Sequence, residues 1–341
     1  MEKSVEEHLF SGEREAQIQA ATQLANLTSK QRHKLAERGV IVPLISMLHS
    51  QNYEAIEAAL FALLGLAFGS ERSKCRIVKS GAVPVLLNLL QCQNKSLMEL
   101  SVAAMLTLSS CKANKLPIAS SGTIEILVEF LNEYYGNDND DNKNSSISMQ
   151  AKLDAISTLH NLSTCHQIIP SFVSSGLVFS LLQIIHDTEK SSDLVNKAIA
   201  LLEDVVSLSE NALQQTAGTS CAIRSLVETI EEGSPQCREH AVRILLFICQ
   251  SCRETYRVLI LREGVMPGLL QLSVDGTWRA RNTARELLLL LRDCSNYNLR
   301  NQQSNHELIE QIMQEIDAEE DRVVDTTTLR LVEEMIAKLS T

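Results

Sequence analysis

One short phrase recurs through this chain at a nearly constant period, and it constrains the fold more than any other feature. The phrase runs Gly-apolar-apolar-x-x-Leu-apolar in five full copies, and a sixth copy is degenerate. The copies begin at Gly39, Gly81, Gly122, Gly176, Cys221 and Gly264, with successive starts 42, 41, 54, 45 and 43 residues apart. A period of this length indicates stacked supersecondary units, each unable to bury its apolar face without its neighbours. The sequence therefore predicts a solenoid.

The composition favours helices as the building blocks of that solenoid. Aromatic residues make up only 4% of the chain, and its 341 residues include just 13 glycines and 6 prolines. This mixture suits long helices that pack through leucine, isoleucine, valine and alanine. Length alone would suggest about two globular domains. We instead expect one continuous all-α core, because a solenoid grows by adding units.

The unit around Gly81 shows how each repeat is expected to fold. A short apolar helix is predicted over 73–79, a second helix over 82–90 and a third over about 96–110. Gly81 falls at the corner between the first two helices, where a positive φ or a close backbone approach favours glycine. Each unit should therefore contain three helices with a glycine corner.

A second phrase, Ala-x-x-x-Leu-x-Asn-Leu, marks the third helix of each unit. Copies of varying quality begin at Ala20, Ala59, Ala155, Ala198, Ala241 and Ala284. The two phrases in register resemble the armadillo repeat, a three-helix unit of ~42 residues. HEAT repeats are the nearest rival, but they usually have two helices and lack the paired phrases. The resemblance covers residues 14–292, as a leading third helix and six units, and implies a right-handed α-solenoid.

Two segments look like the armadillo region of plant U-box ubiquitin ligases and their U-box-less relatives. They span residues 239–252 and 261–267. A U-box docks the ubiquitin-conjugating enzyme, and no part of this sequence resembles one. The resemblance thus implies a chain that has the recruiting half of such a ligase without its docking half.

Three segments fall outside the repeat pattern. Residues 1–13 form an N-terminal lead. An insertion at about 133–149 contains the apolar-free run 136–146, which is either a tolerated surface loop or an acidic, serine-bearing contact loop. The acidic tail 293–341 carries amphipathic patterns over 305–317 and 327–339. These patterns are interpreted as a cap on the last repeat, with a dimerisation or partner-docking element and partial disorder as the alternatives.

Charge, cysteine usage and hydropathy exclude several classes of protein. The net charge of −11 argues against a nucleic-acid surface and favours basic partner segments. The N-terminus lacks the apolar run of a secretory signal, and no stretch approaches the roughly 20 apolar residues of a membrane span. Nine cysteines, an odd number scattered singly, indicate reduced thiols. We therefore expect a cytoplasmic or nuclear protein.

The candidate catalytic and metal-binding residues are few. Cys249 and Cys252 form a lone Cys-x-x-Cys pair, whereas a structural zinc site needs four ligands, so packed or idle thiols are favoured. His160 and His166 flank Cys165, a pattern that a Cys–His nucleophile pair could produce. A solvent-facing His160 and a turn-forming Cys165 are the favoured alternative. We expect no enzyme activity, cofactor, metal or small-molecule substrate.

The armadillo resemblance places a partner-binding groove on the third helices. In that family the third helices line a concave groove, and the repeat asparagine hydrogen-bonds the backbone of an extended peptide. Positions four and eight residues earlier share the asparagine's helix face. We call this face the stripe, and its candidate binding residues are Glu57, Phe61, Glu99, Thr107, Asn161, Asp204, Glu239, Arg243, Phe247 and Glu286.

The stripe carries five acidic residues and one arginine, so it favours neutral or basic segments. Solvated charge on an exposed face is the alternative interpretation. Phe61 and Phe247 can anchor a partner or be buried by a neighbouring repeat. Trp278 either closes one end of the groove or belongs to the core.

Nuclear-import adaptors of this fold place a tryptophan four residues before each asparagine, and this chain has none at those positions. Only Asn26 and Asn161 retain the asparagine, so continuous main-chain clamping is not expected.

The predicted function is a non-enzymatic protein-interaction scaffold that binds partners along the stripe. The alternative is a substrate-recruiting component of a ubiquitin-ligase pathway, whose ligase activity a separate chain would supply. A cargo adaptor for nuclear import would bind lysine-rich peptides, which the missing tryptophans argue against.

Overall fold

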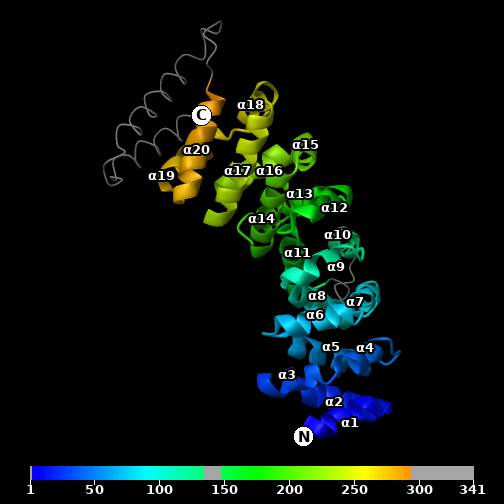
Figure 1. Cartoon of the computed structure of the whole chain (residues 1–341). Coiled ribbons are helices and arrows are strands. Elements are labelled where there is room, and N and C mark those ends of the chain that lie inside the picture. The colour runs from blue at the N-terminus through cyan, green and yellow to red at the C-terminus, as the bar shows by residue number, and fades with distance from the viewer. Residues whose placement is uncertain (1, 134–146, 293–341) are drawn as a thin grey trace, which may run out of the picture. The chain divides into compact units, whose positions relative to one another are not determined.

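The computed structural model describes residues 2–133 and 147–292. Within these ranges the chain forms twenty α-helices and two short 3-10 helices and no strand (Figure 1). It divides into two compact units, Met1–Ile184 and Ile185–Thr341. The insertion run 136–146 and the tail 293–341 lie outside the described residues.

The predicted three-helix unit around Gly81 is confirmed. Its helices are α6 (Glu71–Lys79), α7 (Ala82–Leu90) and α8 (Lys95–Ser109). Gly81 has a φ of 88°, and nothing lies within 4 Å of the position that a Cβ would take. The backbone conformation, and not crowding, therefore selects glycine at this corner.

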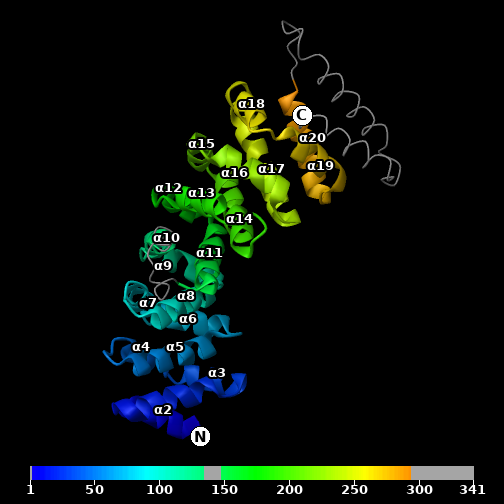
Figure 2. The ribbon, with the colours of Figure 1, turned by 180° about the vertical axis from the view of Figure 1, so that it is seen from behind.

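The first unit contains the leading helices and the first repeats. The third helices α2, α5, α8 and α11 pack on one another in succession (Figures 1 and 2). The remaining elements are α1 (Glu2–Phe10), α2 (Arg14–Ala25), α3 (Ser29–Glu37), α4 (Ile41–Leu48), α5 (Tyr53–Ala67), η1 (Lys112–Asn114), α9 (Lys115–Ala119), α10 (Thr123–Glu133), α11 (Met149–Ser163), η2 (His166–Ile168) and α12 (Ile169–Ser174). Helix α13 (Leu177–Asp187) begins in this unit, and its last three residues belong to the second.

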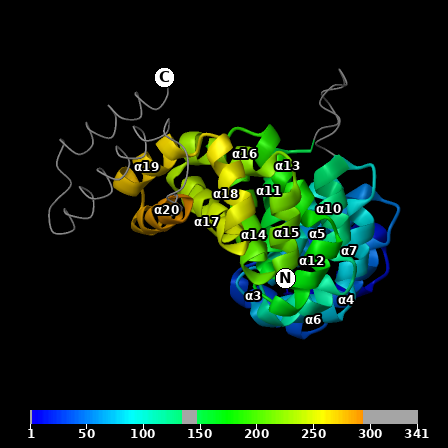
Figure 3. The same ribbon diagram turned by 90° about the horizontal axis from the view of Figure 1, so that it is seen from above.

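The second unit continues the same pattern. The third helix α17 lies between α14 and α20 (Figure 3). The elements are α14 (Asp193–Leu208), α15 (Glu210–Gly218), α16 (Ala222–Glu232), α17 (Pro235–Ser251), α18 (Arg253–Arg262), α19 (Met266–Asp275) and α20 (Trp278–Leu291).

Each third helix of the six repeats begins at a polar N-cap residue. The side chain of that residue accepts a hydrogen bond from the backbone N–H three residues later, which satisfies one of the unpaired donors at the helix start. The N-cap residues are Asn52, Asn94, Ser148, Ser192, Ser234 and Thr277. This local chemistry fixes where the third helices begin.

The N-terminal lead forms a helix of its own. Helix α1 buries Val5 and Leu9 completely and packs against α2. Two apolar residues at a spacing of four produce this contact, and the lead thereby continues the packed core of the first unit.

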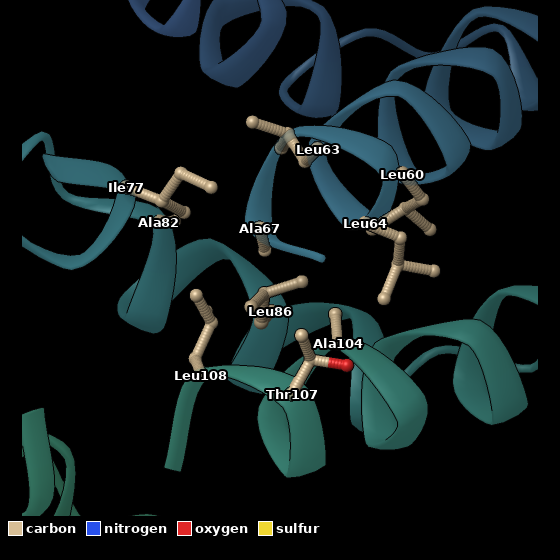
Figure 4. A pocket seen from close by; sticks show the side chains of 10 residues that line it. All are labelled: Leu60, Leu63, Leu64, Ala67, Ile77, Ala82, Leu86, Ala104, Thr107 and Leu108. Atoms are coloured by element: carbon tan, nitrogen blue, oxygen red, sulfur yellow. The ribbon is translucent and has the colours of Figure 1, made fainter. Parts of the chain in front are cut away.

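The core is close-packed and aliphatic. A cavity of only about 10 Å³ lies among α5, α6, α7 and α8, lined by side chains such as Leu60, Leu86 and Leu108 (Figure 4). A cavity needs roughly 10–15 Å³ to hold one water molecule. This space is therefore a packing gap and not a ligand site.

Candidate partner-binding face

All ten candidate residues of the stripe lie on third helices and keep part of their side chains exposed. Glu57, Phe61 and Glu286 are exposed, and the other seven are half-buried. Phe61 is 47% exposed, so no neighbouring repeat covers it. The helical spacing thus identified an accessible face in both units.

Three carboxylates of the stripe are occupied by intramolecular hydrogen bonds. The backbone N–H of Ser148 donates to Glu99 (2.8 Å), and the Thr277 hydroxyl donates to Glu239 (2.6 Å). The Gln250 amide donates to Glu286 (2.8 Å).

Ser148 and Thr277 are the N-cap residues of α11 and α20. Glu99 and Glu239 therefore hold the start of the next third helix, a role that the spacing of the sequence did not reveal.

Glu57 differs from these two glutamates although it occupies the same repeat position. It forms no ion pair or hydrogen bond with any residue that the structure describes, and it lies one helical turn before the exposed Phe61. Glu57 is thus the stripe carboxylate available to a partner in the first unit.

Arg243 is held by a buried carboxylate beneath the stripe. Glu203 on α14 is only 6% exposed, and its Oε1 lies 2.9 Å from Nη1 of Arg243. Its Oε2 lies 2.5 Å from Nδ1 of His240. Burying a carboxylate is unfavourable unless it is paired, so these two partners account for Glu203. Glu203 was missed because it precedes the predicted Asp204 by one residue and points inward.

Two other predicted residues serve the solenoid itself. The Asn161 amide donates to the Ser109 hydroxyl (3.0 Å) and approaches the Leu106 carbonyl (3.5 Å), which ties α11 to α8. The Thr107 hydroxyl donates to the Ala103 carbonyl of its own helix (2.9 Å). Both side chains thus use their donors within the protein.

A cleft of about 550 Å³ between α17 and α20 gathers several residues of the stripe. Its lining consists of Arg243, Leu246, Phe247, Gln250, Trp278, Arg279, Asn282, Thr283 and Glu286. Trp278 is 70% exposed, which excludes the core role left open by the sequence. An aromatic surface beside amide, hydroxyl and charged groups suits the side chains and backbone of a polypeptide.

The remaining candidate chemistry is dispersed. Burial raises the pKa of the Cys249 thiol, whereas the hydrogen bond with Thr255 lowers that of the exposed Cys252. Cys165 occupies the N-cap position of η2, and His166 is exposed. Among residues 2–133 and 147–292, no three His, Cys, Asp or Glu side chains form a group that could hold a metal ion.

No single helix in the described part of the chain is long and apolar enough to cross a membrane. The helical stretches His166–Ser174 and Leu177–Asp187 are together long and apolar enough for a span, but the chain bends by 73° between them.

These features define an armadillo-repeat fold. An engineered protein of known structure superposes with a TM-score of 0.72 at 18% identity, covering 99% of this chain and 78% of its own. A designed armadillo repeat protein gives a TM-score of 0.60 at 18% identity, covering 74% and 99% of the two chains. At these identities the likeness establishes the fold alone.

In sequence, the chain is similar to plant U-box proteins over part of its length. It is 34% identical to U-box domain-containing protein 45 of Arabidopsis thaliana over 146 residues, which make up 42% of this chain and 18% of that protein. It is 28% identical to U-box domain-containing protein 1 of Medicago truncatula over 125 residues, 36% and 18% of the two chains. No family model matches. The fold and these relatives support a protein-binding scaffold.

Proposed function

We propose that this protein binds segments of partner proteins along the stripe, with the α17–α20 cleft as the main anchor. The exposure of Trp278 carries the proposal. A largely exposed indole leaves a large apolar surface in water, and tryptophan is among the residues that contribute most when a partner covers them. Its position beside a cleft, and not on a flat surface, favours a side chain inserted from a partner.

The charges of the stripe favour a neutral or basic segment. Glu57 is unpaired among the described residues of the first unit. Glu286 is exposed in the second unit, where it accepts a hydrogen bond from the neutral Gln250 amide. The chain as a whole has a net charge of −11. A positively charged segment would thus gain from both local and long-range attraction.

The experiment that tests this proposal compares partners captured by tagged full-length chains from a plant cell lysate. Mass spectrometry would identify what the wild type and a Glu57→Arg/Trp278→Ala variant retain, after circular dichroism has shown that both are folded. We expect the variant to lose partners that the wild type retains. Neither substitution touches the carboxylates that hold helix starts.

Phe179→Ala provides the matched control, because Phe179 is 61% exposed on α13 and lies outside the stripe. This variant should retain the wild-type partners. Retention of the same partners by the Glu57→Arg/Trp278→Ala variant would refute the proposed face.

A second candidate function is substrate recruitment in a ubiquitin-ligase pathway, in the cytosol or nucleus. The similarity to U-box domain-containing proteins favours it. On this hypothesis the retained partners include a ligase subunit or a conjugating enzyme, and adding the chain increases ubiquitin transfer to a second retained partner. If the partners depend on the stripe but include no ubiquitin-transfer protein, the scaffold function stands and the role in a ubiquitin-ligase pathway is refuted.

A further inference from the structure

A basic side chain recurs seven residues before the corner glycine in four of the repeats. These residues are Arg32, Lys74, Lys115 and Arg257. Each lies on the first helix of its repeat. A cation there can reach the C-terminal end of the third helix, where unpaired carbonyls concentrate negative partial charge.

In three of the repeats this basic group has a partner at that helix end. Lys74 donates to the hydroxyl of Ser110 (2.8 Å), and Lys115 donates to the hydroxyl of Thr164. Arg257 donates to the carbonyl of Leu291 (2.7 Å). Ser110 and Thr164 are the C-cap residues of α8 and α11. In each of these three repeats the contact ties the first helix to the end of the third, and we call it the clasp.

The first repeat lacks the partner for this clasp. The C-cap residue of α5 is Phe68, which has no hydroxyl and is 75% exposed. Nε of Arg32 is buried and has no hydrogen-bond partner among the described residues. A buried unpaired donor costs about 1–3 kcal/mol, so the protein by itself leaves the Arg32 guanidinium incompletely hydrogen-bonded.

Gly65 makes room for the arginine. A Cβ at this position would lie 3.0 Å from Nη1 of Arg32. The repeat phrase favours asparagine here, and Asn161 occupies the equivalent position of the third repeat. Glycine in the first repeat therefore admits the guanidinium to a space that a larger residue would narrow.

The result is a cleft of about 520 Å³, which we call the Arg32 pocket. It is lined by Ser29, Lys30, Arg32, His33, Gly65, Leu66, Phe68, Gly69 and Ser70. Basic side chains line it and no acidic one does, in a chain with a net charge of −11.

The neighbouring carboxylates are already paired. Glu37 pairs with Arg72 (2.8 Å) and lies 3.8 Å from His33, and Glu71 pairs with Lys74 (2.7 Å). They leave the positive charge of Lys30 and Arg32 uncompensated.

We propose that the Arg32 pocket binds an acidic peptide segment of a partner protein. One carboxylate of that segment accepts hydrogen bonds from the Arg32 guanidinium, whose planar donors match a carboxylate in a paired geometry. Lys30 adds positive charge at the rim. The exposed ring of Phe68 covers an apolar residue next to the acidic one.

This site goes beyond the proposed function of the stripe. It shares only Gly65 with the stripe positions, and its charge preference is opposite. A partner that occupied both would present a basic or neutral segment to α5 and an acidic one to the α3–α5 corner. The two sites can be tested separately because their substitutions do not overlap.

The test measures fluorescence anisotropy of a labelled peptide, Gly-Asp-Glu-Leu-Asp-Phe-Gly, titrated with the full chain. We expect saturable binding below ~1 mM. Arg32→Gln should weaken it at least about tenfold, since hydrogen bonds to charged groups are the strong ones. Phe68→Ser should also weaken it, because the new hydroxyl would engage Arg32 as Ser110 engages Lys74.

Three controls make the result decisive. Lys79→Gln removes an exposed charge from α6 outside the pocket and should leave the affinity unchanged. The amide peptide Gly-Asn-Gln-Leu-Asn-Phe-Gly should bind at least about tenfold more weakly. Glu57→Arg/Trp278→Ala should still bind the acidic peptide, which separates failure of this pocket from failure of the stripe.

Equal binding by the wild type and Arg32→Gln would overturn the proposal, and so would no binding of the acidic peptide. A phosphoserine peptide that bound through Arg32 while the acidic peptide did not would reassign the pocket to phosphate and equally refute an acidic peptide as its occupant.

Discussion

At the scale of single residues, the corner glycines show that the repeat phrase specifies a backbone conformation. All five glycines that begin the phrase have φ between 76° and 89°. Cys221 begins the degenerate copy with a φ of −93°, a conformation open to any residue. Where the sequence has cysteine in place of glycine, the backbone at the corner thus has a negative φ.

Replacement of a corner glycine should destabilise the protein through strain alone. Gly81→Ala should cost about 1–2 kcal/mol, because a Cβ disfavours the left-handed region even where space is open. Gly218→Ala is the matched control, since Gly218 ends α15 without a positive φ and has open space around it. Thermal unfolding followed by circular dichroism should show a lower Tm for the first variant only. Equal Tm values would contradict the explanation.

Thiol reactivity should separate the cysteines by burial. Burial, aided by hydrogen bonds with Glu71 and Cys75, raises the pKa of Cys111 to about 11. The hydrogen bond with Thr255 lowers the pKa of the exposed Cys252. Because the thiolate is the nucleophile, Cys252 should react first with iodoacetamide at pH 7–8 among the cysteines that the structure describes.

Cys111 should react far more slowly than Cys252, and its rate should rise about tenfold per pH unit up to its pKa. Peptide mass spectrometry over a pH series measures both rates. Early modification of Cys111 near neutral pH would show that its environment is more open than the structure indicates.

At the scale of elements, equivalent stripe glutamates should differ sharply in their structural roles. Glu239→Arg should destabilise the protein by about 1–3 kcal/mol, since the Thr277 hydroxyl at the start of α20 loses its charged acceptor. Glu57→Arg, at the same repeat position but without a partner, should change stability by less than about 0.5 kcal/mol. Thermal melts of the two variants give the comparison, and similar losses would refute the distinction.

Lys190 links elements within the second unit. It is 6% exposed, and its Nζ donates to the carbonyls of Ile185 (2.5 Å) and His186 (3.0 Å) near the end of α13. The same atom lies 3.5 Å from Glu228 on α16. A buried ammonium with three oxygen partners is satisfied, and it fixes the loop after α13 against α16.

Glu228 should make the stability of this link depend on pH. Burial alone would raise its pKa, but Arg224 and Lys190 outweigh burial and hold the pKa below the ordinary value of 4.5. A lowered folded-state pKa contributes stability above 4.5 that is lost as the pH falls through the folded value.

The Glu228→Gln variant should therefore have a lower Tm than the wild type at pH 7, and the difference should shrink below about pH 4. Arg262→Gln, at an exposed position on α18, serves as the control. A pH-independent difference would mean that Glu228 acts by packing and not by charge.

At the scale of the whole molecule, the net charge should make the affinity for basic partners depend on salt. With a charge of −11, it should bind a basic peptide, for instance one of alternating lysine and serine, more weakly as salt rises. Anisotropy at about 50 and 500 mM NaCl measures the change, since the Debye length shortens roughly threefold. Glu57→Arg/Glu286→Arg should reduce the salt dependence. A salt-independent affinity would indicate apolar recognition instead.

Much of the architecture was predictable because its determinants are local and repeated. The phrase at Gly81 placed α7 at its observed bounds and α6 and α8 within two residues of theirs. Helix α1 was not anticipated, since its burial rests on two isolated apolar residues, Val5 and Leu9. The candidate face was recognisable because exposure follows helical period, so Glu57 and Phe61 could be placed on it from spacing alone.

By itself, the sequence determined the repeat, its register, the glycine corners and the accessible face of the third helices. Only the tertiary structure decided which polar groups on that face remain free, since partners such as Glu99 and Ser148 or Glu239 and Thr277 come from successive repeats. The Arg32 pocket likewise exists because Gly65 and Phe68 meet an arginine more than thirty residues earlier in the chain. Spacing reveals the face of a helix, but contacts between helices decide which of its side chains are left for a partner.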